Sequence, residues 1–239
     1  MSRKKKKESA QKSRGSSLKI LLIVQIVIIL GLGGTIGYFL LNNGSGAIGA
    51  GNGRKDTQEV TYEELETTDI LPQEQIAEMS LEEAAAETAK GFLTLYHNCD
   101  PKAGDYLRGG EGLSFPEIQA EIARSMTFEI GETRLVENED GFTYALVEVT
   151  IETVSFEAAY EDAKKEFSED ADSTEILTKV TEKLKEYAAS ERDSFVIDIM
   201  VLDYVNSREI LMDSNLSDAI TGGLLTYMEE RLEGGEDDE

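Results

Sequence analysis

The stretch FTYALVEVTIETV, residues 142–154, decides the fold class of this chain. Polar and apolar side chains alternate along it. The apolar face carries Ala145, Val147, Val149 and Ile151, and the polar face carries Glu148, Thr150 and Glu152. This alternation predicts a β-strand, and one charged face is typical of an antiparallel sheet with one side in water. Asp140-Gly141 just before it is a hairpin signal, so we expect pairing with residues 128–137, where Gly131 marks a bulge site.

Helical and strand-like patterns flank this hairpin on both sides. Helical spacing begins at Ser80, which forms a capping box with Glu83. The N-terminal side predicts helices at 80–98, 102–107 and 114–125. The C-terminal side predicts helices at 156–167 and 174–191, strands at 195–205 and 208–213, and a final helix at 215–232. The strands come in hairpins, so the sequence predicts an α+β fold with an antiparallel sheet.

Two details of the second half carry their own predictions. Residues 195–205 are almost continuously apolar, broken only by Asp198 and Asp203, which predicts a central strand largely covered on both faces. Gly222 and Gly223 fall in the middle of the final helical pattern, where each costs about 1 kcal/mol against alanine. We interpret them as positions where this helix packs closely against another element.

The pattern between residues 80 and 233 resembles the NTF2-like class. The resemblance rests on an opening helix, an acidic residue after it and a central hairpin, represented here by Phe92, Leu95, Tyr96, Asp100 and Gly141. The C-terminal part resembles small extracytoplasmic domains of Gram-positive bacteria, of unknown function, through Met212, Asn215, Leu216, Ala219 and Gly222-Gly223. The resemblance implies a curved antiparallel sheet around helices, forming a cone with a pocket. Some members are enzymes and many only bind or dimerise, and no functional residue carries over.

Residues 20–41 form an uncharged, apolar run that predicts a single membrane anchor. As a helix the run reaches about 33 Å, enough for a hydrocarbon layer of about 30 Å. Residues 1–19 carry eight basic side chains and one acid, which gives them a net charge of +7. The whole chain has a net charge of −25 and residues 20–41 are uncharged, so residues 42–239 have a net charge of −32. Basic residues beside an anchor stay cytoplasmic and contact anionic lipid. We expect a cytoplasmic N-terminus and an extracellular domain at a bacterial cell membrane.

The remaining segments complete this layout. Residues 42–79 read as a flexible linker, glycine-rich and then acidic, and residues 234–239 as an acidic tail. A cleaved signal peptide is the competing interpretation, because small residues follow the run near position 47, but the run is longer than a signal core. Gly33 and Gly37 form a GxxxG pair, the spacing of a homodimer face.

Candidate chemistry in the sequence is sparse. His97, Cys99 and Asp100 are the one cluster of reactive types, yet residues two apart at a helix end point in different directions. A zinc site needs more ligands than one histidine and one cysteine, and the acidic clusters match no calcium-loop spacing. The strong negative charge argues against nucleic acid. We therefore expect no catalytic, cofactor-binding or metal residue.

Two functions follow from these observations. The first is a membrane-tethered, non-catalytic binding or scaffolding domain of the cell envelope, whose partner is an envelope protein or ligand that the sequence does not identify. The alternative is an NTF2-like pocket protein that acts as a small-ligand receptor or an enzyme. A cone filled by Phe, Leu and Met favours the first, and converging Asp, Glu or Tyr in an open pocket favours the second.

Overall fold

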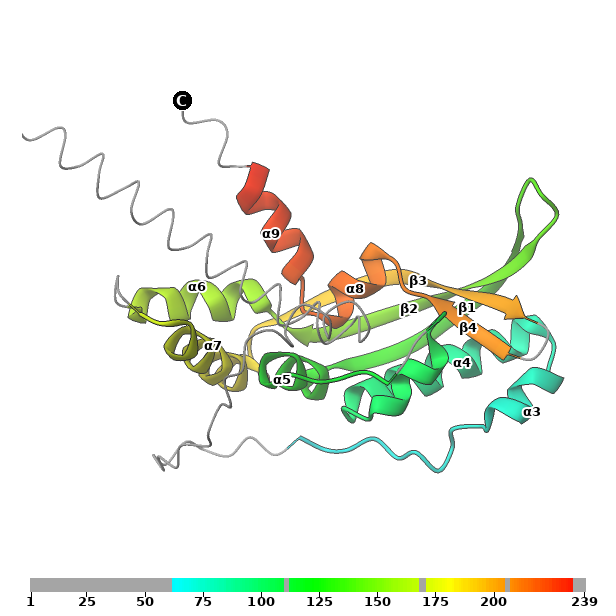
Figure 1. Cartoon of the computed structure of the whole chain (residues 1–239), viewed down its shortest axis with the longest axis horizontal. Helices are drawn as coiled ribbons and strands as arrows, with labels where there is room; N and C mark the ends of the chain where they lie inside the picture. The colour runs from blue at the N-terminus through cyan, green and yellow to red at the C-terminus, as the bar shows by residue number, and fades with distance from the viewer. Residues whose placement is uncertain (1–61, 110–111, 168–170, 205–206, 234–239) are drawn as a thin grey trace, which may run out of the picture.

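The computed structural model describes residues 62–109, 112–167, 171–204 and 207–233, and it confirms the α+β class (Figure 1). Four strands form one sheet in the order β1-β2-β3-β4, and every neighbouring pair is antiparallel. The strands are β1 (Thr127–Glu137), β2 (Thr143–Val154), β3 (Arg192–Tyr204) and β4 (Ser207–Leu211). The expected bulge is present, because the β1–β2 register shifts between Ile130 and Thr133, on either side of Gly131.

The first core lies on the inner face of this sheet. The four apolar residues of β2 that alternate with polar ones are all fully buried there, and Val149 stands opposite Ile197 of β3. Helix α4 (Leu81–His97) contacts all four strands and contributes Phe92, Leu93 and Tyr96. The expected cap is confirmed, since Ser80 Oγ accepts from the Glu83 amide. The short helix η1 (Pro101–Tyr106) and α8 (Ser214–Ile220) complete this core.

A second core lies beyond one end of the sheet (Figure 1). It is built from α5 (Glu117–Ser125), α6 (Phe156–Glu166), α7 (Ser173–Tyr187) and α9 (Leu224–Glu233). Helices α6 and α7 pair between β2 and β3. Lys183 of α7 reaches two acids of α6, Asp162 at 2.9 Å and Glu166 at 3.3 Å. The domain therefore has a sheet half and a helical half.

The final helix is not continuous, which corrects the prediction for residues 215–232. Gly222 and Gly223 separate α8 from α9, with φ angles of +68° and +77° that favour glycine. The close packing predicted for these glycines is present, because the Gly222 carbonyl accepts from the Phe156 amide at 3.0 Å. The helical spacing of apolar residues continues across the break, so periodicity alone did not show it.

The prediction that β3 is largely covered on both faces was wrong at Val196, on its outer face. The strand is central in the sheet, and Ile199 and Val201 are buried on the inner side. Val196 points to the other side and is 67 % exposed. Leu202 points to the same side as Val196 but is only 6 % exposed, so among the described residues the outer face is open at Val196 and covered at Leu202.

Packing begins before Ser80, within residues 42–79, for which the sequence predicts a flexible linker. Helix α3 (Gln73–Glu78) places Ile76 fully buried in the first core. Ile70 and Leu71 pack against the same core. Within the described ranges, no helix is both long and apolar enough to cross a bilayer. The expected anchor, residues 20–41, lies outside these ranges, as do the basic tail and the first part of the linker.

Candidate binding pocket

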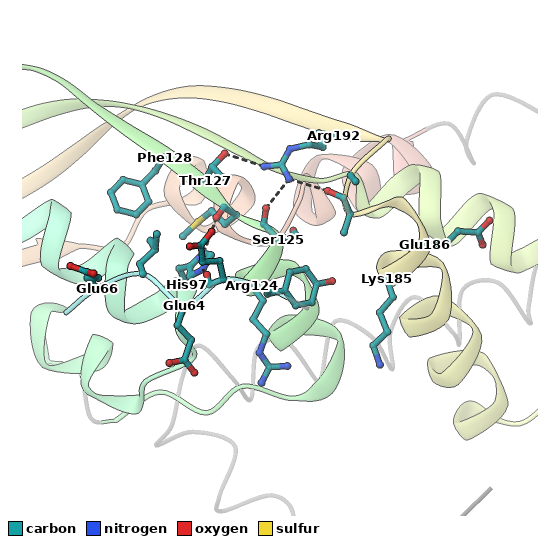
Figure 2. A pocket seen from close by; sticks show the side chains of 16 residues that line it. Glu64, Glu66, His97, Arg124, Ser125, Thr127, Phe128, Lys185, Glu186 and Arg192 are labelled. Atoms are coloured by element: carbon teal, nitrogen blue, oxygen red, sulfur yellow. Dashed lines mark hydrogen bonds between the residues drawn. The ribbon is translucent and has the colours of Figure 1, made fainter. Parts of the chain in front are cut away.

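A pocket of about 770 Å³ opens where the ends of α4, α5 and α7 meet the start of β1 (Figure 2). Residues 62–66, an extended segment that we call the strap, form one side of it. Apolar lining comes from the strap, β1 and the end of α7, through Leu65, Met126, Phe128, Ala188 and Ala189. The basic residues of the lining are Arg124, Lys185 and Arg192.

His97 is the last residue of α4 and holds the strap against the domain. Its buried ring has Nδ1 2.7 Å from the Met126 carbonyl oxygen and Nε2 3.0 Å from the Glu63 carbonyl oxygen. A neutral imidazole donates from one nitrogen only, whereas an imidazolium donates to both carbonyls. Both ring nitrogens are thus close to backbone carbonyl oxygens, and in this arrangement His97 connects the strap to the start of β1.

Asn98 follows His97 and pairs with the strap backbone. Its Nδ2 donates to the Leu65 carbonyl at 2.9 Å, and its Oδ1 accepts from the Leu65 amide at 3.0 Å. One side chain therefore satisfies both backbone groups of Leu65, as a neighbouring strand would. Sequence reasoning missed this residue, because Asn98 and Leu65 are far apart in the chain and no periodic pattern connects them.

Cys99 does not join His97 in a reactive pair. It adopts a positive φ of 55°, and its Sγ lies 3.7 Å from the Ala120 carbonyl of α5. Burial raises the pKa of the Cys99 thiol, and the charge of nearby Arg124 offsets this only in part. Asp100 turns away to cap η1, accepting from the Lys102 amide at 2.9 Å. The three residues of the sequence cluster thus have three separate local roles.

Arg192 lines the pocket, and dashed lines in Figure 2 mark hydrogen bonds that its guanidinium makes with the fold. Its guanidinium donates to the Ser125 and Ala188 carbonyls at 2.8 and 3.0 Å, which lie at the ends of α5 and α7. It also donates to Thr127 Oγ1 and to the Glu152 carbonyl, at 3.1 and 2.9 Å. The planar fork of arginine suits this multiple contact. Nothing in the sequence around Arg192 distinguishes it from a surface arginine.

Arg124 and Lys185 extend together on another side of the pocket (Figure 2). Each is within ion-pair distance of Glu121, at 3.6 and 3.7 Å. Glu121 is only 5 % exposed, so these cations compensate a charge that is almost removed from water. Burial, and next the Glu121 carboxylate, raise the pKa of the Tyr62 hydroxyl in the strap. This corner gathers positive charge in a chain whose net charge is −25.

Among the residues that the structure describes, no three or more His, Cys, Asp or Glu side chains are grouped so that they could hold a metal ion. Comparisons of the chain with protein-family models, with curated proteins and with solved structures find no match. The geometry of the pocket is therefore the basis for any functional inference. The pocket has apolar lining residues, the guanidinium of Arg192 held by backbone carbonyls, the two cations Arg124 and Lys185, and the strap.

Proposed function

We propose that this protein is a non-catalytic binding domain of the bacterial cell envelope, and that it binds its partner at the pocket beside the strap. The observation that carries the proposal is how the polar groups of the pocket are used. His97 and Arg192 direct their nitrogens to backbone carbonyls of the fold. A histidine held in this way is a poor proton shuttle, because its nitrogens already have partners.

The filling of the inner face supports the same proposal. Large apolar and aromatic side chains occupy the space between α4 and the sheet, and Phe92, Tyr96 and Met126 are almost completely buried there. An NTF2-like cone filled in this manner fits a binding or scaffolding role better than catalysis inside the cone. The binding surface is then at the edge of the domain, where the pocket opens.

The proposed cellular setting rests on the sequence. Residues 20–41 supply the single-pass anchor, the +7 tail stays in the cytoplasm on anionic lipid, and the acidic domain faces outward. Protease added to intact cells should remove the domain and spare the tail. Protection of the domain in intact cells, with digestion after lysis, would contradict this topology.

A small-ligand receptor is the alternative, and the size of the pocket favours it. A concave space of about 770 Å³ lies within the range of about 300–1,000 Å³ that is usual for small-molecule sites. Both functions use the same pocket, and they differ in whether a macromolecule or a small molecule enters it. Photo-crosslinking from position 128 in membranes separates them by the mass of the crosslinked product.

The role of the pocket can be tested by filling it. Ala189 is exposed and lines the pocket, so Ala189→Trp should block entry without disturbing a core. In a strain in which deletion of the protein gives a phenotype, Ala189→Trp should fail to restore function. Val196→Trp, on the outer sheet face, is the matched control and should restore it. Cys99→Ser should also restore it. Loss of function in a folded, membrane-localised Cys99→Ser variant would instead indicate catalysis.

A further inference from the structure

We propose that the strap is an autoinhibitory acidic segment, and that its release converts the pocket into a site for an anionic ligand. The proposal rests on the proposed function only in treating the pocket as a binding site. The docking of the strap, its limits along the chain and the charge it brings are each visible in the structure.

The strap is held by few contacts. His97 reaches the Glu63 carbonyl, and Asn98 makes two hydrogen bonds with Leu65. Glu63, Glu64 and Glu66 are exposed, Leu65 is 36 % exposed and Tyr62 is partly covered, so no side chain of the strap is fully buried. Exposed hydrogen bonds contribute little net stability, and segments with few buried apolar contacts open far below the global unfolding free energy. The strap therefore belongs to the least stable part of the described chain.

Release of the strap has a natural limit. The turn after the strap is closed by the Ile70 amide donating to the Thr67 carbonyl at 3.2 Å. Ile70 and Leu71 then pack on the first core, and Ile76 of α3 is fully buried in it. Residues 62–66 can thus leave the domain while the following residues remain in place. In the proposed topology the strap also connects directly to the membrane tether, so tension or crowding at the membrane acts on it first.

Release changes both the shape and the charge of the pocket. With the strap docked, the lining holds three basic residues and four glutamates, three of which belong to the strap. Without the strap, Arg124, Lys185 and Arg192 face a single lining glutamate, Glu186. Outside the lining, Glu121 pairs with Arg124 and Lys185, Glu117 pairs with Lys185, and Glu152 pairs with Arg192, so each of the three cations also has a carboxylate partner in the fold. Release removes the three strap carboxylates from around these cations, so a ligand that carries carboxylate or phosphate groups is repelled less by the open pocket than by the pocket with the strap docked.

The first experiment measures release in the full chain, reconstituted in lipid nanodiscs. Asn98→Ala removes both hydrogen bonds to Leu65 without changing the strap. Amide hydrogen exchange at Leu65 should be at least tenfold faster in this variant than in the wild type, whereas the amides of Val147 and Val149 in β2 should exchange unchanged. Unchanged exchange at Leu65 would overturn the docking described here. Faster exchange in β2 as well would show general unfolding, and would equally reject a strap that opens on its own.

The second experiment measures the inhibition with a fluorescent hexaglutamate peptide as the probe, at a fixed low salt concentration. The Asn98→Ala protein should bind it at least fivefold more tightly than the wild type. Adding Lys185→Gln to Asn98→Ala should abolish this gain, because it removes one of the two cations at the pocket side. Equal affinity of wild type and Asn98→Ala, with Leu65 exchange accelerated, would overturn autoinhibition. Neither measurement depends on the cellular phenotype, so a failure of the proposed function is recognised separately.

Discussion

A β-carbon at Gly222 would stand 2.6 Å from the backbone oxygen of Val154, closer than such atoms approach in folded proteins. This relationship places the junction of α8 and α9 directly on the last residue of β2. The Gly222 carbonyl in turn accepts the Phe156 amide at the start of α6. One glycine therefore lies where the two cores of the domain meet, which explains why no side chain is accommodated there.

Gly222→Ala should destabilise the domain by about 3 kcal/mol, from the strained backbone and the clash with Val154. Gly109→Ala is the matched control, because Gly109 has a similar φ of +64° and nothing within 4 Å of its β-carbon position. The control should cost about 1 kcal/mol, the backbone strain alone. Urea midpoints measure both. Equal losses of stability in the two variants would contradict the close approach of the Val154 oxygen to position 222.

Val149→Thr should destabilise the domain by about 1–3 kcal/mol, because it places an unpartnered hydroxyl on the fully buried face of β2. The two side chains have nearly the same shape, so no cavity is created. Val196→Thr makes the same change on the exposed outer face of β3 and should stay within about 0.5 kcal/mol. Thermal unfolding distinguishes the two variants. A larger effect at position 196 would mean that the outer face is covered in the native protein.

Arg192→Lys should lower stability by about 2 kcal/mol or more, because an ammonium cannot reach the backbone carbonyls of Ser125, Ala188 and Glu152 together. Arg134→Lys is the control. Arg134 pairs with Asp198 on the exposed outer face, where a similar loss of the planar fork should have little effect. Chemical denaturation with both variants tests whether the contacts of Arg192 or its charge matter. If Arg192→Lys costs as little stability as Arg134→Lys, the positive charge that both variants keep is sufficient, and the fork-shaped contacts of Arg192 are not needed.

Acid should loosen the α6–α7 pair before it affects the sheet. Hydrogen bonds from Lys183, and next from Lys165 and Tyr187, hold the pKa of Asp162 well below its usual range. A carboxylate with a lowered folded-state pKa stabilises the fold above its unfolded pKa, about 4, and loses this contribution as pH falls further. Amide exchange in α7 should therefore rise below about pH 4 relative to β2. Asp162→Asn should show fast α7 exchange already at neutral pH. Uniform exchange across both halves would contradict this ion-pair role.

Local pattern predicted the parts of the fold that depend on neighbouring residues. The alternation around Val149 set the faces of β2, and the glycine at 131 marked the bulge, because both signals lie within one strand. The break at Gly222 was not predictable, since it depends on the approach of Val154 from a distant strand. The exposure of Val196 depends on how the other described segments pack around β3, which the sequence of the strand itself does not encode.

The candidate site was less predictable than the fold. The sequence drew attention to His97 because histidine is chemically versatile, yet its ring contacts backbone carbonyls from two distant segments. Asn98 and Arg192 shape the pocket through contacts that span many residues, and both residue types are common on surfaces. The strap makes its hydrogen bonds to His97 and Asn98 through the backbone of Glu63 and Leu65. Such contacts place no requirement on side-chain type, so no sequence pattern predicts them.

The helical pair α6–α7 has the character of an insertion into a hairpin. At its root Val154 pairs with Arg192, and the Ser155 amide donates to the Glu191 carbonyl at 2.9 Å, as the two ends of a tight turn would. The register between β2 and β3 is set by residues outside the insertion. This root is therefore a natural graft point, where another helical pair of different length or charge can be exchanged. The graft must offer apolar cover to Ile118 and Ile122 of α5.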